Sequence, residues 1–157
     1  MKHLLCVLLM ACIGLTAAAQ REQDFASRYM SLYGEGAALQ CATVSPLMME
    51  RILQLPESQE GGHVREVLSQ LKSIRVVSDK TAGAGEALYD KAVELAKDNP
   101  RRYKPYAETD GQSIYLRKRG GVIVELVLLT FNDEGVFNIV NLTGNMTDAF
   151  LRELLNI

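Results

Sequence analysis

Apolar residues recur at helical spacing in five stretches of the chain. Two of these stretches follow a residue that suits a helix N-cap, Asp24 and Ser45, and Pro46 then stands at a first helical position. Spacings of three and four residues between apolar positions indicate one buried face on each helix. We expect helices over residues 25–33, 46–54, 64–71, 85–98 and 147–155.

Strand-like runs alternate with these helices and then dominate the second half of the chain. Two short strands are expected at 38–44 and 74–77, and four more read "YKPYAE", "QSIYLRKR", "VIVELVLLTF" and "GVFNIVNLT". Short turns at 120–121 and 132–135 separate the last three, and such turns join antiparallel neighbours. The pattern predicts an α+β fold, in which helices pack on a mainly antiparallel sheet of about five to six strands that ends in a C-terminal β-meander.

The run "VIVELVLLTF", residues 122–131, is apolar on both of its faces, which is typical of a central strand. We expect the helices 46–54 and 85–98 to cover one face, and the first or the last helix to cover the other. A competing hypothesis leaves the second face open as an interaction surface for a partner or an apolar ligand. That surface would consist of Ile123, Glu125, Val127 and Leu129. Intramolecular cover is favoured, because two helices are available for it.

Residues 1–19 resemble a secretory signal peptide. Lys2 precedes a run that is apolar from 4 to 15, and small residues at 17–19 suit signal peptidase. The pattern predicts export to the periplasm or cell envelope, with a mature chain that starts at Gln20. The remaining residues, 20–157, are of a length typical of a single domain.

A lipidation signal competes with simple secretion. The segment 9–12 reads Leu-Met-Ala-Cys, which would place an acyl anchor on Cys12. Because Met10 fits that signal poorly, secretion is favoured, and contact with a membrane is expected only if Cys12 is lipidated.

Charge and cysteine content argue against a general nucleic-acid-binding protein and against a disulfide-linked domain. Removal of the leader leaves 16 basic and 19 acidic residues, a formal charge of −3, which argues against general nucleic-acid binding. Cys41 is then the one remaining cysteine, so the mature chain has no internal disulfide. Its setting, "ALQCATV", predicts a small buried strand residue.

The turn Gly83-Ala84-Gly85 before a helix resembles a phosphate-binding loop. However, Leu88 stands where a dinucleotide fingerprint has its third glycine, and Glu86 stands where a P-loop has lysine. Because an acid at that position repels phosphate, a structural corner is favoured, and no cofactor is expected.

Candidate catalytic groups are few. His63 is the one histidine left after leader removal; it lies in the polar loop 57–63 without a second ligand nearby in sequence, so no metal site is expected. No nucleophile motif is found. A non-catalytic binding or interaction module, with an unknown envelope protein or component as partner, is therefore favoured. The alternative is an acid-based envelope hydrolase that uses Glu125 or Asp110.

Basic residues gather at two places that strand pairing would bring together. They are Arg101, Arg102 and Lys104 before one strand, and Arg117, Lys118 and Arg119 at the end of the next. Two interpretations follow: a basic patch for an anionic partner, or solvated charges that protect a sheet edge. The second is favoured, because charge runs are usually solvated.

Four stretches carry a family resemblance: "ATVSPLMMERILQLP", "LSQLKSIRVVSD", "LYDKAVELAKDN" and "RKRGGVIVELVLLTFNDEGVFNIVNLTGNM". In order and spacing they resemble the domain-of-unknown-function 4252 family, across nearly all of the mature chain. The resemblance implies a secreted or lipid-anchored envelope protein of gut-type Gram-negative bacteria with an α+β fold. It implies no activity and no catalytic residue.

Overall fold

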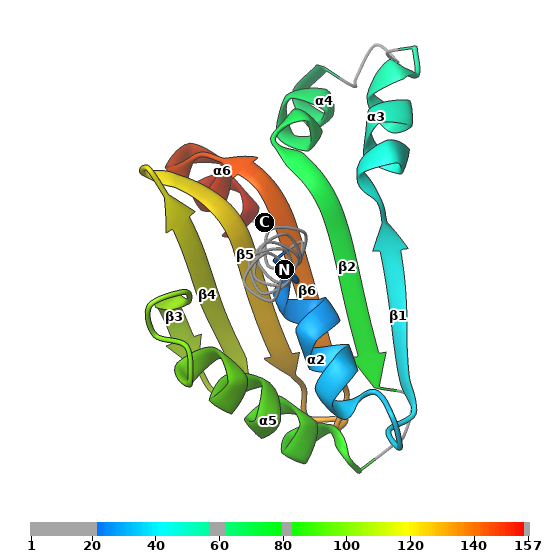
Figure 1. Ribbon diagram of the computed structural model, residues 1–157, viewed down its shortest axis with the longest axis vertical. Coiled ribbons are helices and arrows are strands. Elements are labelled where there is room, and N and C mark those ends of the chain that lie inside the picture. The colour runs from blue at the N-terminus through cyan, green and yellow to red at the C-terminus, as the bar shows by residue number, and fades with distance from the viewer. Residues whose placement is uncertain (1–21, 57–61, 80–82, 156–157) are drawn as a thin grey trace, which may run out of the picture.

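The computed structural model describes residues 22–56, 62–79 and 83–155. Within these ranges, six strands form one antiparallel sheet in the order β1-β2-β6-β5-β4-β3 (Figure 1). The strands are β1 (Leu39–Val44), β2 (Leu71–Asp79), β3 (Lys104–Thr109), β4 (Gln112–Arg119), β5 (Val122–Phe131) and β6 (Phe137–Met146). The predicted α+β fold with a C-terminal meander is confirmed. The leader 1–19, with Cys12, and the start at Gln20 lie outside the described residues.

The helices also lie close to their predicted positions. Ser45 caps one of them by accepting a hydrogen bond from Met48 N at 3.3 Å, and Thr147 caps the last by accepting from Phe150 N at 3.1 Å. Two boundaries were wrong. His63 belongs to a helix rather than to the predicted loop, whose residues 57–61 are not described. Leu71 begins a strand rather than ending the predicted helix 64–71, so that strand is longer than the predicted 74–77. The helices are α2 (Phe25–Tyr33), α3 (Pro46–Gln54), α4 (Gly62–Ser69), α5 (Gly85–Lys97) and α6 (Asp148–Leu155).

The two faces of the sheet are covered by different helices. Helices α2 and α5 lie across one face (Figure 1), where Phe25, Tyr29 and Leu88 pack on Val127 and Leu129. Helices α3, α4 and α6 pack on the other face, around Met49, Leu126 and Phe150. We call these the α2/α5 face and the α6 face.

The predicted assignment of helices to faces was wrong in one respect. Helices α3 and α5 were expected together, but they contribute to the two different core clusters. The connections explain the difference. Helices α3 and α4 join the neighbouring strands β1 and β2, whereas α5 crosses the sheet from β2 to the far edge strand β3.

A β-bulge in β5 changes the predicted alternation of side chains. Arg117 pairs with Glu125 and Lys118 pairs with Ile123, so Val124 is an extra residue in β5. The extra residue turns Ile123 to the α6 face, whereas Glu125, Val127 and Leu129 stay on the α2/α5 face.

These four side chains are at most 1% exposed. The hypothesis of an accessible interaction surface at Ile123, Glu125, Val127 and Leu129 was therefore wrong, because the chain's own helices cover it.

The prediction of a buried Cys41 was also wrong, because its side chain is exposed. Strand β1 is an edge strand with one neighbour, β2, and its residues from 40 to 43 are all exposed. The helices cover the inner strands, so an apolar-looking sequence at the edge stays in contact with solvent.

Backbone geometry explains the two glycines at the start of α5, Gly83 and Gly85. Gly83 adopts a φ of +98°, which side-chain-bearing residues rarely adopt. A Cβ on Gly85 would lie 2.1 Å from the carbonyl oxygen of Gly135, in the turn between β5 and β6. Both glycines thus serve a tight corner against another turn.

Candidate anion-binding site

Two elements bring three arginine side chains to one place. Asn99 and Pro100 end α5, and the following turn, in which Arg102 N donates to Asn99 O at 3.0 Å, positions Arg102. Arg117 and Arg119 are two residues apart in β4, so strand alternation turns both toward the α2/α5 face. We call Arg102, Arg117 and Arg119 the arginine cluster.

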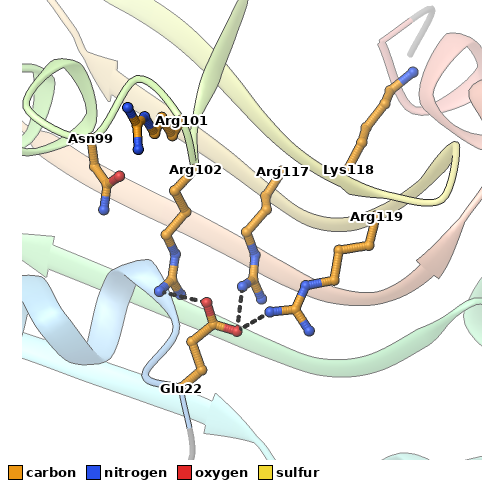
Figure 2. Close-up of a pocket in the computed structure, with 7 residues that line it drawn as sticks. All are labelled: Glu22, Asn99, Arg101, Arg102, Arg117, Lys118 and Arg119. Atoms are coloured by element: carbon orange, nitrogen blue, oxygen red, sulfur yellow. Dashed lines mark hydrogen bonds and ion pairs between the residues drawn. The ribbon is translucent and has the colours of Figure 1, made fainter.

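The arginine cluster surrounds the carboxylate of Glu22, which precedes α2. Arg102 Nη1 lies 3.1 Å from Glu22 Oε1, and Arg117 Nη1 lies 2.7 Å from Oε2. Arg119 Nη2 donates to the same Oε2 at 2.5 Å. Arg102 also donates to the backbone carbonyl of Gln23. Figure 2 shows the three guanidinium groups pointing toward this one carboxylate.

A second carboxylate, that of Glu125, lies beneath the arginine cluster and is fully buried. Arg117 Nε is 3.0 Å from Glu125 Oε2, and Arg102 Nη2 is 3.6 Å from the same oxygen. Asn141 Nδ2 donates to Oε1 at 3.2 Å, and the Tyr103 hydroxyl lies 3.4 Å from Oε2. Glu125 therefore orients the arginines from inside the protein.

Glu125 and Asn141 also hold the start of α2. Phe25 N donates to Glu125 Oε1 at 2.6 Å, and Ala26 N donates to Asn141 Oδ1 at 2.9 Å. Ser27 N donates to the N-cap residue Asp24 at 2.8 Å. The first free amides of the helix thus all have acceptors, two of them from the sheet, and the positive end of α2 faces a buried negative charge.

The electrostatic state of the site follows from these contacts. The Arg117 guanidinium beside Glu22, helped by Arg102 and Arg119, holds the pKa of that carboxyl below its usual value of 4.5. Burial, and then the charge of Glu125, raise the pKa of the Tyr103 hydroxyl, so this group stays protonated and can donate. At neutral pH the site therefore contains an ionised Glu22 among three cations.

The arginine cluster opens onto solvent through two hollows. One, of about 350 Å³, is lined by Glu22, Asn99, Arg101, Arg102, Arg117, Lys118 and Arg119. The other, of about 310 Å³, is lined by Glu22, Asp24, Lys72, Arg117, Arg119, Val124, Thr143, Gly144 and Asn145. Glu22, Arg117 and Arg119 belong to both linings, so the Glu22 side chain lies between the two hollows.

Some of the donors here are not fully used. Arg102 Nε, Arg117 Nε and Arg117 Nη1 are buried and lack a hydrogen-bond partner within the described ranges. The two Arg117 atoms lie 2.7 Å from Glu22 Oε2 and 3.0 Å from Glu125 Oε2, so both take part in ion pairs. Arg102 Nε is thus the guanidinium nitrogen of the arginine cluster that is buried without a partner in the described part of the chain.

Five of the six basic residues singled out from the sequence line the first hollow, all but Lys104, and these five are not equivalent. Arg102 and Arg117 have side chains only 16% and 15% exposed, so the interpretation as solvated edge charges does not describe them. Lys118 points away in Figure 2 and bonds Asp148 of α6 at 2.8 Å, and Arg101 also points away from Glu22. Lys104 is exposed in β3.

The two candidate acids of a hydrolase do not come together. Asp110 is exposed in the turn between β3 and β4. Gln112 pairs with Thr130 and Arg117 with Glu125, so about 16 Å of strand separates that turn from Glu125. Paired carboxylates in glycoside hydrolases lie within about 10 Å of each other. Glu125 instead shares Arg102 and Arg117 with Glu22, because each of these arginines contacts both carboxylates.

Three residues of the site, Glu22, Tyr103 and Asn141, were not predicted from the sequence. Glu22 is one acid among many, and no local pattern connects it to arginines at a distance of about 80 to 97 positions. Asn141 offered a weak signal, because it places an amide between the apolar residues Val140 and Leu142 in the middle of a strand.

Fold and site together define a small α+β domain with a pocket of arginines on one face of an open antiparallel sheet. The chain matches the family described as "Domain of unknown function (DUF4252)" over residues 33–154, and it belongs to that family. The match includes the arginine cluster and Glu125, whereas Glu22 precedes it. No curated protein and no solved structure matches the chain.

Two features are absent from residues 22–56, 62–79 and 83–155. None of the helices there has both the length and the apolar character needed to span a bilayer. No group of three or more His, Cys, Asp or Glu side chains there is arranged to hold a metal ion.

Proposed function

We propose that this domain is a non-catalytic binding module of the cell envelope that holds an anionic group of a ligand in its arginine cluster. One observation carries the proposal: three guanidinium groups from two separate elements converge on a single carboxylate at a solvent-open hollow. The planar guanidinium fork matches the geometry of carboxylates and phosphates.

The setting of the arginines supports binding over simple surface charge. Glu125 below, with Tyr103 and Asn141, fixes the guanidinium groups before any ligand arrives, which lowers the cost of ordering them. Three positive charges face two carboxylates, so the cluster attracts a further negative charge even while Glu22 is in place.

The envelope location is part of the proposal, and it is supported by the leader-like residues 1–19. Mass spectrometry of the protein recovered from its source cells tests it. We expect a chain that begins at Gln20. A chain that begins at an acylated Cys12 would place the domain on a membrane surface, and an uncleaved chain would overturn export.

Anion binding is tested by calorimetric titration with inorganic phosphate at constant ionic strength. Because Glu22 occupies the arginines, the native chain and the Glu22→Gln variant are both titrated. Arg119→Gln removes one guanidinium whose side chain is 65% exposed, so it should leave the fold intact. Arg51→Gln, at an exposed position of α3, is the control with the same charge change.

We expect one saturable site per chain that Arg119→Gln weakens about tenfold and Arg51→Gln leaves unchanged, since a hydrogen bond between charged groups contributes about 1.5 kcal/mol or more. The proposal fails if neither the native chain nor Glu22→Gln binds phosphate saturably. It also fails if both arginine variants weaken binding equally.

A further inference from the structure

We propose that Glu22 is a tethered occupant of the anion site, and that the natural ligand is a linear molecule with two or more anionic groups that displaces Glu22 and spans both hollows. This inference rests on the proposed function and adds the class of ligand to it.

The contacts of Glu22 are those expected of a bound ligand rather than of a core residue. Its carboxylate takes ion pairs from all three arginines, yet its side chain is 43% exposed. By contrast, Glu125 is fully buried and bonds the backbone of α2. Glu125 therefore belongs to the fold, whereas Glu22 occupies the open side of the arginine cluster.

The segment that carries Glu22 can move without disturbing the sheet. Arg102 makes two contacts with the residues just before Asp24: an ion pair with the Glu22 carboxylate and a hydrogen bond to the Gln23 carbonyl. From Asp24 onward, the chain is fixed independently by the salt bridge to Arg75 at 2.8 Å and by the bonded amides of α2. A hinge just before Asp24 would free Glu22 and leave α2 in place.

The shape of the site indicates a ligand longer than a single ion. Glu22 lies between hollows of about 350 Å³ and 310 Å³, and its withdrawal would join them through their shared residues Arg117 and Arg119. The joined cavity has Arg102 at one end and Lys72 at the other. A ligand with one negative group at the cluster and a second beside Lys72 satisfies both ends.

The test compares two inorganic probes, phosphate and linear tripolyphosphate, by calorimetry at constant ionic strength. Three variants separate the parts of the proposal. Glu22→Gln removes the occupant's charge, and Glu35→Gln, in the exposed loop after α2, is its control with the same charge change. Lys72→Gln alters the second hollow alone.

A site that its own carboxylate occupies about nine times in ten binds about tenfold more weakly than the free site. We therefore expect Glu22→Gln to lower the Kd for both probes about tenfold and Glu35→Gln to leave both unchanged. We expect Lys72→Gln to weaken tripolyphosphate several-fold and to leave phosphate unchanged. Circular dichroism and the thermal midpoint confirm that each variant is folded.

Each other outcome overturns a defined part. If Glu22→Gln binds no more tightly than the native chain while Arg119→Gln still loses binding, the displacement of Glu22 is wrong and the proposed function stands. If Lys72→Gln affects the two probes equally, the ligand with two anionic groups is wrong. If no variant binds either probe, the proposed function itself is wrong.

Discussion

The two faces of the sheet are built on different principles. By strand alternation, the five buried polar residues of the described ranges all lie on the α2/α5 face: Ser73, Asp79, Ser113, Glu125 and Asn141. The core of the α6 face consists of apolar residues alone. An apolar face accepts a helix wherever volumes match, whereas a polar face accepts it only where donors meet acceptors.

The difference explains why the site lies where it does. On the α2/α5 face, Glu125 and Asn141 fix the start of α2 over one point of the sheet, and that point adjoins the arginine cluster. The residues before α2 are thereby delivered to the arginines. On the α6 face, the neutral Gln70 side chain holds the start of α6 by accepting from Thr147 N at 3.0 Å, and the Lys118 to Asp148 pair is exposed.

The largest effect is expected from removing the buried charge of Glu125 on the α2/α5 face. Glu125→Ala leaves Arg117 without its buried partner and Phe25 N without its acceptor. Loss of one member of a buried ion pair costs about 3–5 kcal/mol of unfolding free energy. Urea denaturation measures it. A loss below about 1 kcal/mol would contradict the central role of Glu125.

On the other face, Leu126→Ala should act through volume alone. Leu126 is 1% exposed in the apolar cluster, and such truncations cost about 2–5 kcal/mol according to how far the cavity collapses. The same denaturation experiment measures the loss, and phosphate titration should show an unchanged Kd. A raised Kd would show that the two faces are coupled and would contradict their independence.

A smaller effect is expected at Asn141, which bridges Glu125 and α2. Asn141→Ala leaves Ala26 N buried without an acceptor and removes one donor to Glu125. An unsatisfied buried group costs about 1–3 kcal/mol. Asn138→Ala, at a half-buried position of the same strand, is the control. Equal losses in the two variants would show that the bonds to α2 contribute nothing.

The smallest effect concerns pH. The arginines lower the pKa of Glu22 in the folded state, so the ionised form is favoured there. Its contribution to stability is present above the ordinary value of 4.5, and it is lost as the pH falls through the lower folded pKa. An NMR titration of the Glu22 side chain should give a midpoint below 4.5, which Arg119→Gln raises. A native midpoint at or above 4.5 would contradict the ion pairs.

The helices and strands could be predicted from the sequence, but not which of them pack against each other. Period-two and helical patterns located the meander and the helices, because those patterns are local. The assignment of α3 and α5 to one face failed, because it depends on which strands each connection joins. The turn of Ile123 away from Glu125 was missed, because Val124 looks like any other strand residue.

The candidate site was predictable to a similar degree. The sequence indicated that strand pairing would bring the two basic runs together, and β3 and β4 do pair, but solvated edge charges were the favoured interpretation. Which of their side chains are half-buried depends on the strand phase and on Glu125 below. That Glu22 belongs to the site could not be predicted, because its arginine partners are distant in sequence.

The bonds at the start of α2 also set an order of events during folding. Phe25 N and Ala26 N bond side chains that lie 100 and 115 positions later in the chain. These bonds cannot form until β5 and β6 have been synthesised and paired, and contacts of such sequence separation form slowly. Within the described residues α2 is the first helix along the chain, yet the bonds that fix its start wait for strands about 100 positions later, and the ion pairs of Glu22 wait for β4.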